Sequence, residues 1–273
     1  MKVDLTSGQH IGIVNWITIA ATILGAGSYL AWKPRNLRAQ GIMMAGCCTF
    51  IGLLTVDLTL TALCHLTTFR LDLYAYRFDA VFGQPSFYLG RILEAHRWLR
   101  VVSTAVYDTP GAFFLALATA YYTTQPLPEA KDFMRTAVIC LIPAPLLYLV
   151  VPVSGPIYAF STFPDFAPVL HSAHVVYLYP PPNGVPSIHV AFALILLHFA
   201  RKWKLGILLG SFFAFFTFLS TMGLGEHYLV DVLAAVPHAA ISIYLGGSTP
   251  LRRTQSVCSS VEGTFVSSLS EGG

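Results

Sequence analysis

The sequence predicts an all-α fold, a polytopic membrane helical bundle, and three observations lead to this class. Hydrophobic residues make up 55% of the 273 residues and charged residues only 11%. The mean hydropathy is +0.64, so the chain has too little polar surface to cover a soluble globule of its length. Long apolar stretches also recur along the chain, and a helix needs about 20 such residues to cross the hydrocarbon layer. We therefore expect one membrane domain over 1–250.

About seven transmembrane helices account for these stretches. In chain order they are 11–32, 41–66, 101–124, 134–155, 186–201, 205–222 and 228–247. Several contain Gly or Pro, which membrane helices tolerate. The first is not expected to be a cleaved signal peptide, because its apolar part is long and the arm before it is barely basic. The tail 251–273 is rich in serine and glycine, and we expect it to be disordered and cytoplasmic.

The lysines and arginines give an orientation, because cationic residues stay on the cytoplasmic side of a membrane. With the amino terminus outside, the inner loops and the tail receive ten of the sixteen: Lys33, Arg35, Arg38, Lys131, Arg135, Arg201, Lys202, Lys204, Arg252 and Arg253. Five of the other six fall in one long outer loop, 67–100. We therefore expect a multi-pass membrane protein with its amino terminus and the loop 67–100 on the non-cytoplasmic side.

The outer loop 67–100 mixes its five arginines with Leu, Tyr, Phe and Trp at roughly helical spacing. Such a segment is typical of amphipathic helices that lie on a membrane surface. Two interpretations are open. The arginines only anchor the loop to lipid headgroups, or some turn inward and bind a phosphate, for which the planar guanidinium is well suited.

The fifth apolar stretch begins with the run "GVPSIHVAFAL", which carries Ser187 and His189 in its first turn. One interpretation is a hydrogen-bonded core histidine beside a helix cap, as most buried polar groups are simply paired. The other is a functional site. Because this stretch is short for a span, we expect its first turn to lie below the membrane surface, at the floor of a cavity.

A second polar motif, "STMGLGEHYLVDVLAA", stands before the last span and places His227 four residues before Asp231. On a helix this spacing puts both on one face. An aspartate that holds one imidazole nitrogen leaves the other free and more basic, as a nucleophilic histidine needs. The alternative is a buried pair that holds two helices together. Two spans separate the motifs, so His189 and His227 belong to the same membrane face, outside in this orientation. We expect no metal, since no cysteine or His-x-x-x-His pair is near.

These motifs resemble a known family. "PSIH" at 186–189 and the pattern from Ser220 through His227 to Asp231 are similar to the second and third signature motifs of the type 2 phosphatidic acid phosphatase superfamily. "GEHYLVD" and "VPVSGPIYAF" at 151–160 are most similar to the branch with inositol phosphorylceramide synthases and sphingomyelin synthases. The resemblance implies a six-helix phosphatase-type core.

The resemblance also implies an activity. It implies a metal-independent lipid phosphatase or phosphotransferase that needs no cofactor, acts on a lipid phosphate at the membrane through a phosphohistidine, and has no nucleic-acid partner. His227 would be the nucleophile, Asp231 its orienting partner and His189 the acid that protonates the leaving oxygen. The implied phosphate-binding groups are Ser187, the turn begun by Pro186, and Ser220.

The chain departs from the superfamily pattern at its cationic positions. Thr221 stands where the third motif has arginine, Ile188 replaces a glycine of the second, and the lysine of the first motif is not found. We expect arginines of the outer loop to substitute, first Arg91 and then Arg77. Three functions stay open: a phosphatase, a headgroup transferase like inositol phosphorylceramide synthase, or a non-catalytic lipid-binding or transport protein that keeps the fold.

Overall fold

The computed structural model describes residues 36–67, 69–173 and 182–247, and this part of the chain is helical without a strand. The all-α prediction is confirmed. The helices are α2 (Leu37–Leu66), α3 (Asp72–Ala80), α4 (Pro85–Ala95), α5 (Arg97–Asp108), α6 (Pro110–Thr124), α7 (Leu127–Leu141), α8 (Ala144–Val150), α9 (Pro156–Ala159), α10 (Ile188–Ala200), α11 (Lys204–Gly223) and α12 (Leu229–Gly246). The expected span 11–32 and the tail 251–273 lie outside the described residues.

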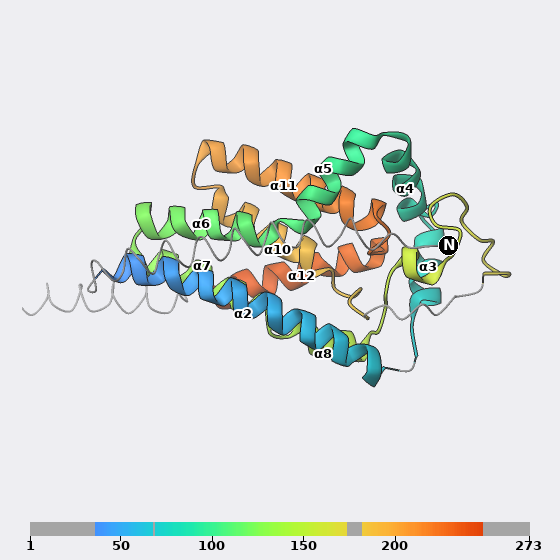
Figure 1. Cartoon of the computed structure of the whole chain (residues 1–273), viewed down its shortest axis with the longest axis horizontal. Helices are drawn as coiled ribbons and strands as arrows, with labels where there is room; N and C mark the ends of the chain where they lie inside the picture. Colours follow the sequence, from blue (N-terminus) through green and yellow to red (C-terminus); the bar gives the residue numbers. More distant parts are fainter. Residues whose placement is uncertain (1–35, 68, 174–181, 248–273) are drawn as a thin grey trace, which may run out of the picture.

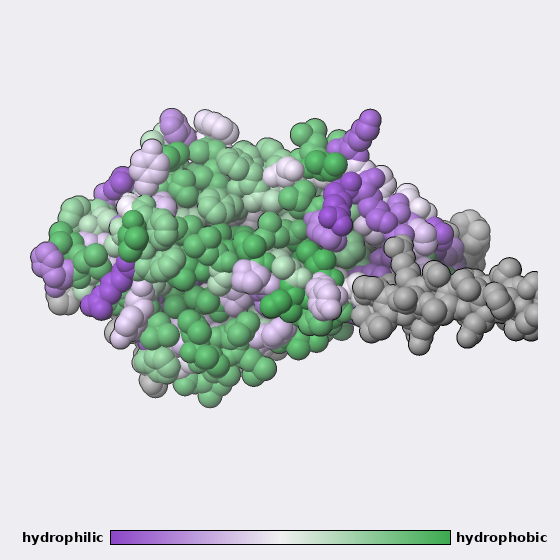
Figure 2. All heavy atoms as spheres, turned by 180° about the vertical axis from the view of Figure 1, so that it is seen from behind, coloured by the Kyte–Doolittle hydropathy of each residue, from purple (hydrophilic) through white to green (hydrophobic). Residues whose placement is uncertain are grey.

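Three helical stretches of the described chain are long and apolar enough to cross a membrane, Leu127–Val150, Lys204–Gly223 and Leu229–Gly246. The count rises to four if the bent pair α5 and α6 forms one span. Hydrophobic side chains cover most of the middle of the molecule, while hydrophilic residues gather toward its two ends (Figure 2). These features are consistent with an integral membrane protein. The count of about seven spans stays a prediction.

The region 101–124, expected as one straight span, is instead two helices bent by 59°. The break falls at Thr109, between α5 and Pro110 at the start of α6. A proline has no N–H to donate and pushes the residue before it out of the helical conformation. The fourth span begins at Leu127 rather than at 134 and ends at Val150 rather than at 155, and α2 covers the whole of the expected 41–66.

The helix α10 lies at the centre of the bundle and packs against α6, α7, α11 and α12 (Figure 1). It has 13 residues, as short as its sequence predicted. Its buried residues are mostly small or branched, Val190, Ala191, Ala193, Ile195, Leu196 and Ala200. Small side chains let neighbouring membrane helices approach closely. Close packing against four helices therefore holds α10, including its first turn, in place at the centre of the bundle.

The two ends of the bundle differ in chemistry. At one end lie the α6–α7 and α10–α11 connections, where Lys202 pairs with Glu129 and Arg38 donates to the carbonyl of Thr123. At the other end α3 packs against α12 and α4 packs against α11 (Figure 1). The outer loop 67–100 is thus folded into α3, α4 and the start of α5, as its amphipathic pattern predicted.

Candidate active site

Ser187 defines the start of α10. It is fully buried, and its Oγ accepts a hydrogen bond from the N–H of Val190 at 3.5 Å, as a serine N-cap does. Its own backbone N–H donates to the carbonyl of Asp231 at 3.0 Å. Pro186 before it is buried as well. The first turn of α10, which carries His189, is therefore tied directly to the first turn of α12.

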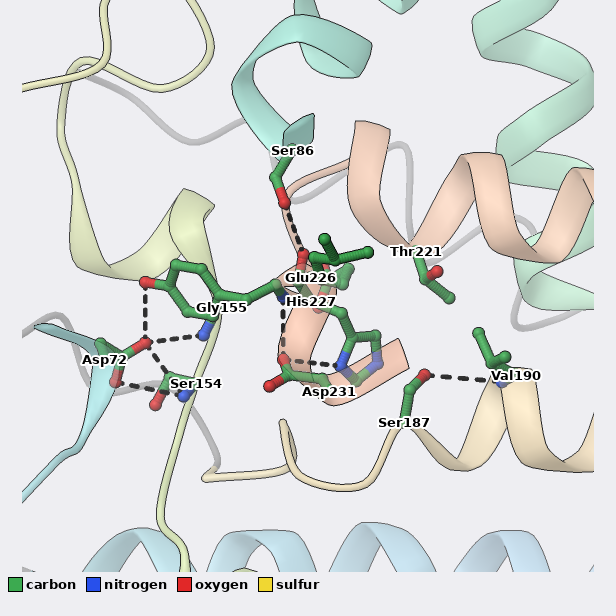
Figure 3. A network of polar contacts seen from close by, with 12 residues as sticks. Asp72, Ser86, Ser154, Gly155, Ser187, Val190, Thr221, Glu226, His227 and Asp231 are labelled. Atoms are coloured by element: carbon green, nitrogen blue, oxygen red, sulfur yellow. Dashed lines mark hydrogen bonds and ion pairs between the residues drawn. The ribbon is translucent and has the colours of Figure 1, made fainter. Parts of the chain in front are cut away.

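Asp231 organises the start of α12. Its Oδ2 accepts from the backbone N–H of Tyr228 at 2.8 Å and lies 3.4 Å from Nδ1 of His227. The second ring nitrogen of His227 is turned toward the Ser187 loop at the start of α10 (Figure 3). His227 and Asp231 are 1% and 0% exposed. The expected contact between the two residues is present, and it leaves Nε2 directed at the other motif.

The two histidines come together. Their ring centroids are 6.4 Å apart, which is too far for a direct hydrogen bond. The ring of Tyr107 stacks on His189 at 4.1 Å between centroids, with 16° between the planes. Stacking of this kind restricts the rotation of the half-buried imidazole. Tyr107 could not be predicted from the motifs, because it lies about 80 residues before His189, in α5.

Burial controls the charge of the groups around the nucleophile candidate. It lowers the pKa of His227 to about 3, and the backbone of Gly184 offsets only part of this effect. The imidazole is therefore neutral at pH 7 and keeps a lone pair, as nucleophilic attack requires. Burial also raises the pKa of the neighbouring Glu226 to about 7, although the hydroxyl of Tyr158 stabilises its carboxylate at 3.2 and 3.1 Å.

Two buried carboxylates of α3, which belong to neither of the two histidine motifs, reach the same region. Asp79 accepts from the N–H of Leu229 at 3.0 Å. Asp72 accepts from the N–H of Gly155 at 2.9 Å and from the Tyr228 hydroxyl at 3.2 Å. Figure 3 shows Asp72 beside Ser154 and Gly155, and Ser86, the serine that accompanies Asp79, next to the backbone of His227. Asp72 and Asp79 are seven residues apart in the sequence, a spacing that places both on one face of a helix and could have predicted their shared burial.

The other expected substrate-binding residues lie elsewhere. Ser220 is buried in α11, and its hydroxyl donates back to the carbonyl of Thr217 at 3.0 Å. Arg91 is exposed and donates to the carbonyl of Asp165 at 3.4 Å. Arg77 is also exposed, with its guanidinium over the ring of Tyr74. Nothing in the described residues brings Arg91 or Arg77 into contact with the histidines, so their role in binding phosphate stays a prediction.

A different arginine of the outer loop, Arg70, is connected to the segment before the "PSIH" motif through a hydrogen bond to Ser154. Arg70 donates through Nε to Ser154 Oγ at 3.2 Å and through Nη1 to the carbonyl of Thr67 at 2.7 Å. Ser154 belongs to the same loop as Val153, whose carbonyl accepts from Gly184 at 2.7 Å just before the "PSIH" motif. Among the described residues, no group of three His, Cys, Asp or Glu side chains has an arrangement that could hold a metal ion.

The fold and the site define a helical membrane protein with a buried His–Asp pair facing a second histidine. A family model described as the PAP2 superfamily matches residues 76–245, well over half of the chain. The protein therefore belongs to the PAP2 superfamily, whose members are typically phosphatases. No curated protein and no solved structure matches the chain. The family supports an enzyme that acts on phosphoric esters, and the substrate and mechanism belong to the proposal below.

Proposed function

We propose that the protein is a lipid phosphate phosphatase or phosphotransferase that works through a phosphohistidine on His227. The observation that carries this proposal is the geometry around that residue. Asp231 lies 3.4 Å from Nδ1, and the ring of His189 stands 6.4 Å away on the other side. A phosphate between the two rings is within reach of a nucleophile and of a proton donor at once.

The proposed reaction has two balanced steps. In the first, the lone pair of His227 Nε2 forms a bond to phosphorus while the bond from phosphorus to the lipid oxygen breaks, and His189 gives its proton to that oxygen. In the second, water or an alcohol attacks the phosphohistidine, gives its proton to His189, and releases His227. The anionic phosphate favours the protonated His189 that the first step needs.

Asp231 supports the first step electrostatically. The imidazole of His227 gains positive charge as its lone pair is shared with phosphorus. A carboxylate beside Nδ1 stabilises that charge and holds the tautomer in which Nε2 is the free nitrogen. Buried ionisable groups in membrane proteins are costly and are usually retained for function, which favours this role over a purely structural pair.

We also propose that the site faces the non-cytoplasmic side. Of the basic residues assigned to the inner loops, Arg201 and Lys202 lie in the α10–α11 connection, Arg38 and Lys204 in the first turns of α2 and α11, and Lys131 and Arg135 in α7. The α6–α7 and α10–α11 connections lie at the end of the bundle opposite α3 and α4 (Figure 1). The outer side of α3 exposes Tyr74, Arg77 and Phe78. A surface of aromatic and cationic side chains suits the headgroup region of a bilayer, so α3 would lie at that interface and close the site from above.

The test is a panel of radiolabelled lipid phosphates with the purified full chain in detergent and EDTA. Release of free phosphate indicates a phosphatase. Movement of the labelled headgroup to a second lipid indicates a transferase of the inositol phosphorylceramide synthase type. No turnover and no acid-labile labelling with any lipid would contradict the proposal and favour a non-catalytic lipid-binding protein.

A further inference from the structure

The inner face of α3 carries two carboxylates that the proposed phosphoryl transfer does not use. Asp72 and Asp79 are 1% and 0% exposed, although the helix lies outside the membrane-spanning segments. Burial raises the pKa of Asp72 to about 6 and that of Asp79 to about 7. Burying a carboxylate costs free energy unless it is hydrogen-bonded. The hydrogen-bond partners of Asp72 and Asp79 therefore indicate which part of the structure each carboxylate stabilises.

Asp79 contacts the residues that surround His227 in the chain. Both of its oxygens lie 3.0 Å from the N–H of Leu229, the first residue of α12. Its Oδ2 is also 3.3 Å from Ser86 Oγ, and the same Oγ lies 3.1 Å from the carbonyl of His227. Asp79 and Ser86 therefore fix the backbone immediately before and after Tyr228.

Asp72 contacts the segment around Tyr228 from its other side, through the loop that contains Ser154 and Gly155. It accepts from the N–H of Ser154 at 3.1 Å, from the N–H of Gly155 and from the hydroxyl of Tyr228. Gly155 has φ +124°, and a Cβ there would come within 2.4 Å of the carbonyl oxygen of Glu226. The loop held by Asp72 thus lies directly against the backbone before His227. Contacts on both sides leave the loop little freedom to move.

We infer that Asp79, acting with Ser86, is a positioning residue that sets the backbone of His227 so that its ring lies between Asp231 and the substrate. Asp72 supports the same loop from the other side. The inference rests on the proposed function, since it assigns the residue that aims the proposed nucleophile. Asp79 itself does not touch the reacting atoms.

The physical reason for a carboxylate at this position is its number of acceptor sites. One carboxylate can accept from the Leu229 N–H and the Ser86 hydroxyl together. An apolar residue of similar size would leave the Leu229 N–H buried without an acceptor. The ring of His227 is turned by small rotations of this backbone, and a displacement of about 1 Å at a reacting group can cost about 100-fold in rate.

The experiment compares Asp79→Ala, Asp79→Asn and Ser86→Ala with Glu94→Gln as a matched control. Glu94 is exposed on α4 and makes only a 3.9 Å ion pair with Arg100, so its loss should change nothing. We expect Asp79→Ala to lower kcat about 100-fold with KM nearly unchanged. Asp79→Asn keeps an oxygen for Leu229 and should recover part of the rate, and Ser86→Ala should fall between wild type and Asp79→Ala.

Hydrogen exchange of the full chain supplies a second measurement that needs no turnover. The amides of 226–231 should exchange faster in Asp79→Ala, while those of α10 and α11 stay at the wild-type rate. Wild-type kcat in Asp79→Ala overturns the inference, and so does faster exchange across the whole bundle, which marks a merely structural role. If the wild type turns over no lipid, the proposed function fails, and unchanged exchange at 226–231 in Asp79→Ala still overturns the positioning of the loop.

Discussion

Replacing Asp231 by asparagine isolates the charge that Asp231 places beside His227. A single oxygen of Asp231, Oδ2, serves both the ring nitrogen at 3.4 Å and the Tyr228 N–H at 2.8 Å. An asparagine whose amide oxygen occupies that position keeps both contacts and the helix cap. Only the negative charge is lost, so the variant separates electrostatic support of the nucleophile from the architecture of the loop.

The expected magnitude follows from the kind of contact that changes. At 3.4 Å the contact between Asp231 and His227 Nδ1 does not meet hydrogen-bond geometry in this structure, and we expect it to tighten as the imidazole gains positive charge. A hydrogen bond to a charged group is worth about 1.5–3 kcal/mol. At 1.36 kcal/mol for each factor of ten, this predicts a loss of about 10- to 150-fold in kcat for Asp231→Asn. Asp231→Ala also removes the cap of α12, which should lower the free energy of unfolding by about 1 kcal/mol.

The assay is single-turnover release of label from the best lipid phosphate of the panel, with rapid acid quenching to measure the phosphoenzyme. Formation of the phosphoenzyme should slow in Asp231→Asn, while its thermal midpoint in detergent stays at the wild-type value. The Glu94→Gln variant serves as the control at the exposed surface. A loss of less than about threefold in Asp231→Asn, smaller than the weakest charged hydrogen bond predicts, would refute electrostatic support of His227 by Asp231.

Two further predictions concern the histidines and pH. His227→Ala should abolish both turnover and acid-labile labelling, whereas His189→Ala should lose most activity on lipids but retain more on an activated aryl phosphate, whose leaving oxygen needs little protonation; equal losses on both substrates would remove the acid role from His189. Because the folded state raises the pKa of Asp72 to about 6 and of Asp79 to about 7, it keeps protons that the unfolded chain releases above pH ~4. The contribution of these two carboxylates to thermal stability should therefore fall as pH rises from about 4 to about 7, whereas the lowered pKa of His227 contributes in the opposite direction. The difference between wild type and Asp79→Asn across this range should isolate part of the falling contribution.

The sequence predicted those parts of the site that depend on local spacing. His227 and Asp231 were expected on one face of a helix, but α12 begins only at Leu229. Their contact forms because Asp231, in the first turn of α12, turns back toward the residues that precede the helix. The shortness of the fifth apolar stretch likewise predicted α10 and the buried position of Ser187 at its start.

What the sequence did not predict depends on contacts between distant elements. Arginines were sought as phosphate ligands because they suit phosphate chemically, but Arg77 and Arg91 point outward from α3 and α4. The inward face of the same segment carries Asp72 and Asp79 instead. Only packing of α3 against α12 shows which face is inside. Pro110 could have predicted the bend at Thr109, but the continuous hydrophobicity of 101–124 favoured a single straight span.

The starts of α10 and α12 meet at the site, and their different caps predict where the phosphate binds. A helix amino terminus carries roughly half a positive charge and favours anions. In α12 this field faces Asp231, whereas α10 has a neutral serine cap and no acidic residue in its first turn. The start of α10, beside His189, is therefore the end whose field is available to a phosphate.

Ser187→Asp tests this assignment, because aspartate caps a helix about as well as serine and adds a negative charge where the phosphate is expected. Ser187→Asn is the matched control, with nearly the same size, a capping oxygen and no charge. Because Ser187 is fully buried, both larger side chains should lower the thermal midpoint, and the charged one should lower it more. We expect Ser187→Asp to raise KM at least about tenfold above that of Ser187→Asn, since like charges in a poorly solvated site repel strongly. Equal KM values for the two variants would place the phosphate away from α10, and the histidines would then need a cation from another part of the chain to bind it.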